Sequence, residues 1–324
     1  MSAEPAIRPD AAGLASPDWG GFDMARTRGR GWIDVRRSFM TAVRLGWQME
    51  ANWTDPVLFF IYSVAKPLAS VLILVLMLDV VAAGSAAKPE YRAFVVVGSA
   101  LWSFVLGGVS GLAWMILDDR ERYRMLKYVY VSPSAFLAVV FGRGVARIGV
   151  GAMGAAITLA VGVAFLGVPF DVGRIDWPTL AVVMVLGIGS ILAIGLLLAA
   201  ICIQTRQESW SYPDAAAGAL FLVSGVVFPL SVLPVPVQAL GLLTPLTWWL
   251  EGVRLSLFPG GVTAIGGPGT LYEELAGASP PSASTIVLML LATGAVATLG
   301  ALAVFRASDR RAKDRGLLDQ TTGS

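Results

Sequence analysis

The sequence predicts an all-α polytopic membrane protein with six transmembrane helices. Hydrophobic residues make up 56% of the 324 residues and charged residues only 14%, whereas a soluble protein carries about 25% charged residues. Several apolar runs are longer than the roughly 18 residues that mark a membrane span. Lysine and arginine are also distributed unevenly among the segments between these runs, as in multi-pass proteins of fixed orientation. These observations exclude a soluble enzyme.

Two segments precede the membrane domain. Residues 1–31 are rich in Ala, Pro, Gly, Asp and Arg without an apolar period, which predicts a mobile N-terminal tail. Residues 32–54 show a helical pattern with an apolar stripe and a polar stripe, Val35, Phe39, Val43 and Trp47 on one and Arg37, Thr41, Arg44 and Gln48 on the other. Because the next segment enters the membrane directly, we expect an interfacial amphipathic helix rather than an ordinary surface helix.

Residues 55–306 form the predicted six-span domain. The spans cover about residues 57–81, 93–117, 136–168, 179–203, 215–230 and 285–305. Asp55-Pro56 opens the first span, since proline is favoured in the first turn of a helix. Lys66-Pro67 lies inside that span, and its lysine is costly there unless it faces other helices or water. The second span carries glycines that predict close helix contacts, namely Gly98, Gly107, Gly108 and Gly111. Arg143 and Arg147 in the third span are expected to snorkel toward water.

The fifth predicted span is short for a straight transmembrane helix. About sixteen residues at 1.5 Å each give roughly 24 Å, against a hydrocarbon core of about 30 Å. Two apolar helices follow, near residues 237–243 and 246–258, and we expect them to return from the outer side as short, half-depth helices before the last span. Trp248 and Trp249 are then expected at the membrane interface.

The sequence carries further signals around the second of these short helices and after it. Glu251 and Arg254 are three residues apart and could pair on one helix face. Residues 259–284 are rich in glycine and proline and predict a loop. Residues 307–324 predict a basic cytoplasmic tail.

The charged segment, residues 118–133 with the sequence DDRERYRMLKYVYVSP, separates the second and third spans. Two aspartates at its start and Lys127 toward its end predict a short amphipathic helix, which Ser132-Pro133 would terminate. On that helix Arg120, Arg124 and Lys127 would share one side. Two interpretations stay open: a helix that presses on a soluble partner, or a solvated loop that obeys the positive-inside rule.

Counting lysines and arginines predicts the orientation. With both termini inside, seventeen of the 24 basic residues lie in inner segments, four in outer segments and three within spans. This bias predicts a multi-pass protein with both termini and the charged segment in the cytoplasm.

The sequence lacks the residues of most catalytic sites. It has no histidine and only one cysteine, Cys202, which excludes an internal disulfide, histidine-ligated metals and histidine-activated nucleophiles. No Gly-Lys pair occurs, so no Walker A phosphate loop is present. Spans two to six carry no central carboxylate of the kind that relays protons in coupled carriers. We therefore predict no catalytic, cofactor-binding or metal-binding residue, and expect passive conduction or energy taken from a partner.

Two stretches resemble a known family. Ser224 to Pro234 reads SGVVFPLSVLP, followed by LTPLTW from Leu243 to Trp248 and by EGVR from Glu251 to Arg254. This pattern resembles the signature of ABC-2-type exporter permeases. The charged segment is similar to that family's cytoplasmic coupling segment, with Glu121-Arg122, then Leu126, then Val131-Ser132-Pro133. It departs from the usual pattern at Arg124, where glycine is common, and at Lys127, where a second acid is common.

The resemblance implies a division of labour between subunits. The permease forms the membrane path, usually as a dimer, and we expect the second copy to be identical. Two copies of a separate ABC ATPase subunit bind ATP and Mg²⁺. The chain itself would be no enzyme, would hold no cofactor and would bind lipid but no nucleic acid, in a bacterial plasma (inner) membrane. Its coupling residues would be Arg120, Glu121, Arg122, Met125, Leu126 and Lys127. Its returning-helix signature would be Pro229, Pro234, Pro245, Glu251 and Arg254.

The expected function is export of an amphipathic drug, lipid or lipid-linked glycan by an ATP-driven transporter. The alternative is a passive channel or an ion-coupled carrier without an ATPase partner. A third class, an intramembrane lipid-modifying enzyme, is disfavoured by the absence of histidine and of paired intramembrane acids.

Overall fold

The computed structural model describes residues 32–51, 55–82, 89–132, 135–205, 210–277 and 280–314. The predicted N-terminal tail lies outside the described residues, as do Pro133 and the side chains of Lys66 and Lys127. Every element in the described part of the chain is helical. The predicted all-α class is therefore confirmed for that part.

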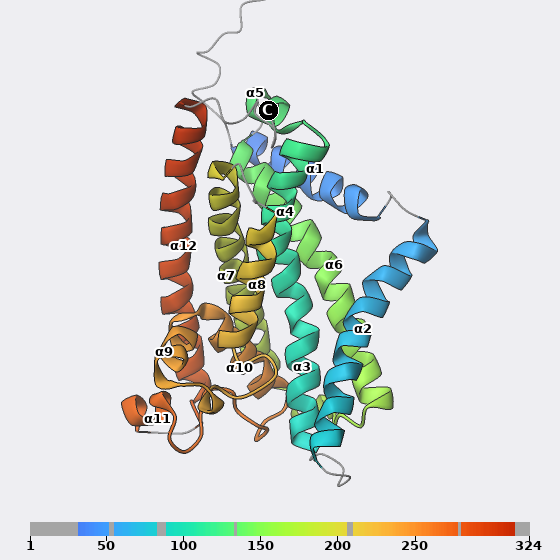
Figure 1. Cartoon of the computed structure of the whole chain (residues 1–324), viewed down its shortest axis with the longest axis vertical. Helices are drawn as coiled ribbons and strands as arrows, with labels where there is room; N and C mark the ends of the chain where they lie inside the picture. Colours follow the sequence, from blue (N-terminus) through green and yellow to red (C-terminus); the bar gives the residue numbers. More distant parts are fainter. Residues whose placement is uncertain are drawn as a thin grey trace, which may run out of the picture.

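The helices form an elongated bundle whose two ends differ (Figure 1). One end carries α1 (Trp32–Ala51), α5 (Leu126–Val131) and the C-terminal part of α12 (Ala283–Asp314). We call this the α5 end. The opposite end, which we call the α10 end, carries α9 (Val235–Leu243), α10 (Pro245–Leu257) and α11 (Leu271–Ala276).

The remaining helices run between these ends. They are α2 (Pro56–Val81), α6 (Phe136–Phe165), α7 (Trp177–Gln204), the shorter α8 (Ser211–Val223), and one long rod. The rod consists of α3 (Pro89–Val105), the π-helix η2 (Leu106–Ser110), α4 (Gly111–Leu117) and the π-helix η3 (Asp118–Arg122). Short 3₁₀ turns occur at η4 (Val172–Arg174) and η5 (Leu230–Val232).

Four helical stretches in the described part of the chain are long and apolar enough to cross a membrane. They are Pro89–Arg122, Phe136–Phe165, Trp177–Gln204 and Ala283–Ala312. These four agree with the second, third, fourth and last predicted spans, so the chain is an integral membrane protein. α2 contains Pro67 and has 26 residues, while α8 has only 13, or about 20 Å of helix. The fifth segment is thus even shorter than the sequence predicts.

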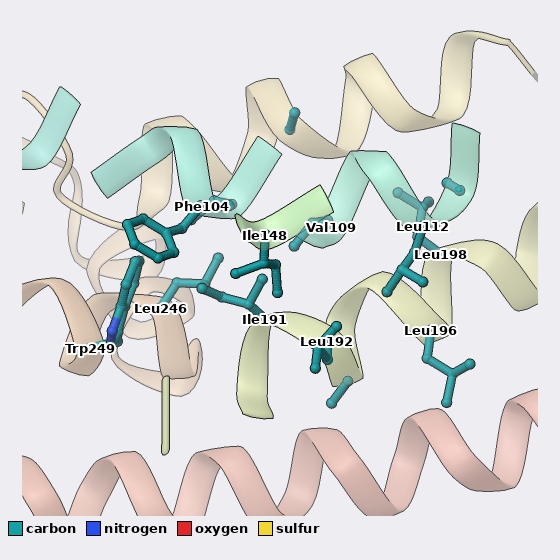
Figure 2. Close-up of a cluster of buried hydrophobic side chains, with 14 of the residues drawn as sticks. Phe104, Val109, Leu112, Ile148, Ile191, Leu192, Leu196, Leu198, Leu246 and Trp249 are labelled. Atoms are coloured by element: carbon teal, nitrogen blue, oxygen red, sulfur yellow. The ribbon is translucent and has the colours of Figure 1, made fainter. Parts of the chain in front are cut away.

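Buried aliphatic and aromatic side chains from the rod, α6, α7 and α10 meet in the middle of the bundle (Figure 2). Phe104 of α3 meets Trp249 of α10 edge to face, with ring centroids 5.9 Å apart. Trp249 is fully buried, and its indole occupies the space that a Cβ atom at Gly187 of α7 would need. Trp248 and Trp249 are therefore buried by protein, because α10 packs into the bundle, and their expected depth at the membrane interface stays a prediction.

Two other boundaries differ from the sequence prediction. The 259–284 loop contains the short helix α11, which begins after Thr270 and ends at Gly277 with a left-handed backbone. The Thr270 hydroxyl accepts a hydrogen bond from the Glu273 backbone N–H, which is a capping arrangement that the sequence Thr-Leu-Tyr-Glu already signals. α12 continues to Asp314, so the first part of the predicted basic tail is helical.

Candidate functional site

The charged segment does not begin a helix of its own. Its first five residues, η3, continue the rod from α4, and the Tyr123 backbone N–H donates to the Asp118 carbonyl at 2.8 Å. Arg124 then adopts a left-handed backbone with φ of 49°, which is uncommon for a residue with a side chain. A turn at Arg124 therefore separates η3 from α5. The predicted continuous helix, with Arg120, Arg124 and Lys127 on one side, is wrong.

A buried ion pair fixes the base of the charged segment to α6. Asp119 accepts from the Arg143 guanidinium, and the two side chains are 4% and 5% exposed. One turn along α6, Arg147 contacts Glu50 of α1 at 2.8 Å and Asp118 at 3.6 Å. The expectation that Arg143 and Arg147 snorkel to water is wrong for Arg143, which Asp119 meets inside the protein. The Arg147 side chain is 21% exposed and meets carboxylates of η3 and α1 that are themselves part-exposed.

Small residues let α1 lie directly on α6. A Cβ atom at Gly46 would meet Ala146 at 3.0 Å, and one at Gly142 would meet the Phe39 carbonyl at 2.6 Å. Ala42 is buried in the same contact, while Arg37, Thr41, Arg44 and Gln48 are exposed. The predicted polar stripe of α1 is thus exposed, but its predicted apolar stripe is not fully covered: Val35, Phe39 and Val43 are half-buried and Trp47 is 41% exposed.

Arg120 joins the charged segment to α7. Its side chain is 5% exposed, and Nη1 donates to the carbonyl oxygens of Cys202 and Thr205, each at 3.0 Å. Its Nε donates to the Glu121 carboxylate at 2.7 Å. Arg120 therefore faces the bundle and does not lie on the outer surface of the segment.

The six residues predicted to couple to a partner differ in accessibility. Leu126 is buried like Arg120, Glu121 and Met125 are partly buried, and Arg122 is exposed. The outer surface is formed by Arg122, Tyr123, Arg124 and Tyr128, which we call the tip face. Its tyrosines are 44% and 68% exposed, and the Arg122 guanidinium lies 5.5 Å from the Tyr123 ring centroid. Docking at this segment stays a prediction, but the surface available for it is cationic and aromatic.

At the α10 end, Arg254 joins three elements. It lies 4% exposed over the Phe94 ring, with Cζ 3.7 Å from the centroid. Its guanidinium donates to the carbonyls of Gly225 at 2.8 Å, Val226 at 2.6 Å and Phe94 at 3.3 Å. α10 is thereby tied both to α3 and to the chain that leaves α8.

Glu251 holds the loop after α10 instead of pairing with Arg254. Its carboxylate accepts from the Ala264 backbone N–H at 2.8 Å and from the Thr263 hydroxyl. The ion pairs within the described part of the chain do not join Glu251 to Arg254, so the expected pairing is wrong. Glu251 is bound by a backbone N–H and a hydroxyl of the loop after α10, and Arg254 by backbone carbonyls of α3 and of the chain after α8.

The three signature prolines lie directly before, or at the start of, short helices in the same region. Pro229 precedes η5, Pro234 precedes α9 and Pro245 is the first residue of α10. These positions need no backbone N–H for a helix, which suits proline. Two short helices thus follow the fifth segment within two residues of the predicted bounds, and their return from the outer side stays a prediction.

A cavity of about 540 Å³ opens beside α10, at the end of the bundle opposite the tip face. Apolar side chains such as Phe170 and Phe258 line it together with the charged Glu90, Asp171 and Arg174. Its volume falls within the range of small-molecule sites, about 300–1,000 Å³. Arg254 and Glu251 also line it, but their hydrogen bonds are made to backbone groups and, for Glu251, also to the Thr263 hydroxyl.

Comparison with known protein families shows to which family the chain belongs. The model of the ABC-2 type transporter family matches residues 39–258, well over half of the 324 residues. The chain therefore belongs to the ABC-2 type transporter family and is a transmembrane permease component, of the kind that generally works with an ABC ATPase. Comparison with curated proteins gave no match.

Proposed function

We propose that this chain is the permease subunit of an ABC exporter that carries an amphipathic substrate and is driven by a separate ATPase. The observation that carries this proposal is the tip face, an exposed cationic and aromatic surface on a base held by buried ion pairs. Such a surface can receive force from a soluble protein without being deformed. The chain itself contributes no catalytic group, and ATP and Mg²⁺ bind in the partner.

The assembly follows the family pattern. Two ATPase copies bind below two permease copies in a bacterial inner membrane, with both termini and the tip face in the cytoplasm. The distribution of basic residues supports this orientation, with seventeen of 24 in the inner segments. Six segments then cross or enter the bilayer, and α9 and α10 lie on the outer side, where the cavity beside α10 opens.

The charge of the tip face indicates the chemistry of its partner surface. Arg122 and Arg124 are exposed there, and Glu121 is engaged by Arg120. A groove with carboxylates and room for two tyrosine rings is complementary to this face, since aromatic and arginine side chains carry most binding energy at interfaces.

A binding and turnover assay tests the function. We expect the purified chain alone to hydrolyse no ATP above a detergent blank, and the chain with its ATPase to show substrate-stimulated turnover. Arg122→Glu and Tyr128→Ala should each weaken ATPase binding by roughly tenfold or more, as for interface anchors. Arg174→Glu, an exposed arginine at the α10 end, is the matched control and should bind normally. ATP turnover by the chain alone, or wild-type binding by both tip variants, would contradict the proposal.

A further inference from the structure

Arg120 lies behind the tip face rather than on it, and its contacts lead away from any docked partner. Its Nη1 reaches two carbonyls at the C-terminal end of α7, those of Cys202 and Thr205, each at 3.0 Å. The last carbonyls of a helix have no intrahelical partner. A cation at this position also interacts favourably with the negative end of the helix dipole. Arg120 therefore both caps α7 and connects it to η3.

The same turn of α7 is bound to α12 on its other side. Gln204 donates from Nε2 to the Ser308 carbonyl at 2.8 Å and to the Ser308 hydroxyl at 3.0 Å. The Ser308 hydroxyl in turn donates to the Ala200 carbonyl at 2.8 Å. A continuous set of hydrogen bonds thus runs from η3 through the last turn of α7 to α12.

The neighbouring residues of η3 hold different helices. Asp119 is paired with Arg143 of α6, and Asp118 lies 3.6 Å from Arg147, which also contacts α1. Arg120 extends the contacts of the segment to α7. A displacement of η3 would therefore reach α6 through Asp119 but α7 and α12 through Arg120.

We propose that Arg120 is a positioning residue that makes the last turn of α7 move with the charged segment. Through it, a partner bound at the tip face acts on α7 and α12 as well as on the rod and α6. The role of the partner rests on the proposed function, whereas the contact between Arg120 and α7 can be tested on the chain alone.

Cys202 provides the measurement, because it is the only thiol in the chain and is fully buried beside Arg120. Fraying of the last turn of α7 exposes this thiol to a small maleimide. We expect Arg120→Gln to raise the labelling rate of the purified chain by roughly tenfold, since two charge-assisted hydrogen bonds are lost. Arg120→Lys should restore part of the protection, and Arg122→Gln, the adjacent exposed arginine, should leave the rate unchanged. Equal rates in wild type and Arg120→Gln, or an equal rise in Arg122→Gln, would overturn the proposal.

The second arm separates positioning from simple stabilisation. In the complex with the ATPase, ATP should change the Cys202 labelling rate of the wild type, and Arg120→Gln should abolish this response while still binding the ATPase. An ATP response that persists in Arg120→Gln would overturn the positioning role. If the wild-type chain binds no ATPase, the proposed function fails instead, and labelling of the chain alone still decides whether Arg120 holds α7.

Discussion

At the scale of single residues, the Asp119–Arg143 pair is the most deeply buried charge interaction at the α5 end. Removing one partner leaves the other charge buried without compensation, which is more costly than replacing both. We expect Asp119→Asn to destabilise the protein by about 3 kcal/mol or more. The double variant Asp119→Leu with Arg143→Met should recover most of that loss. The melting temperature of the purified protein measures both, and equal melting of the single variant and wild type would rule out a structural role for the pair.

Asp176 gives a residue-scale prediction of pH dependence. It precedes α7, outside the span, and accepts hydrogen bonds from Thr179, which hold its pKa below the ordinary value of 3.8. A lowered pKa means that the ionised form is favoured in the folded protein, so this stabilisation is fully present above the ordinary pKa and is lost as the pH falls through the depressed value. The wild type should therefore lose more stability than Asp176→Ala between pH 5 and pH 2. An equal loss of stability in the two proteins across that pH range would contradict this role of the Asp176 carboxylate at the start of α7.

At the scale of elements, the contact between α7 and α10 depends on an absent side chain. The indole of Trp249 occupies the position of a Cβ at Gly187, whereas a Cβ at Gly189 on the same helix would meet nothing within 4 Å. Overpacking of a filled core costs about 1–3 kcal/mol. We expect Gly187→Ala to lower stability by that amount, and Gly189→Ala, its matched control, to melt at or above the wild-type temperature. A drop of the same size in both variants would instead indicate a general effect of alanine in α7.

The elements also show what could be predicted from the sequence. Apolar runs and prolines located most helices, because those signals act within one helix. The burial of Trp249 could not be predicted in this way, since the space for it is supplied by Gly187, a residue of another helix far away in the sequence.

The charged segment was misjudged for a related physical reason. Two aspartates resemble a helix start, but the preceding rod continues through them as a π-helix. The arginines that meet them come from the third span, where a single-helix argument predicts snorkelling instead. Arg124 was recognised as an unusual residue at a position where glycine is common, and the structure gives it the left-handed backbone that glycine adopts easily.

At the scale of the whole molecule, the two ends of the bundle should lie on opposite sides of the membrane. α1 and α5 are at one end and α9, α10 and α11 at the other (Figure 1), and the cavity is lined by residues of α10 and of the loop that follows it. The four spanning stretches run between these ends as apolar helices. A short loop could not replace them, because its backbone polar groups would be unpaired in the membrane. The bias of lysine and arginine predicts that the α5 end faces the cytoplasm.

Single cysteines in a Cys202→Ala background test this orientation in intact cells with a membrane-impermeant maleimide. Gly173, Gly260 and Leu275 are exposed at or near the α10 end, and cysteine at each should be labelled from outside. Cysteine at Tyr128 or Arg310, exposed at the α5 end, should be labelled only after the cells are opened. Reversed labelling would show that the orientation is the opposite one, in which the tip face could not meet a cytoplasmic ATPase. Labelling of Leu275 from inside with Gly173 still outside would instead show that α9 and α10 belong to a further full crossing.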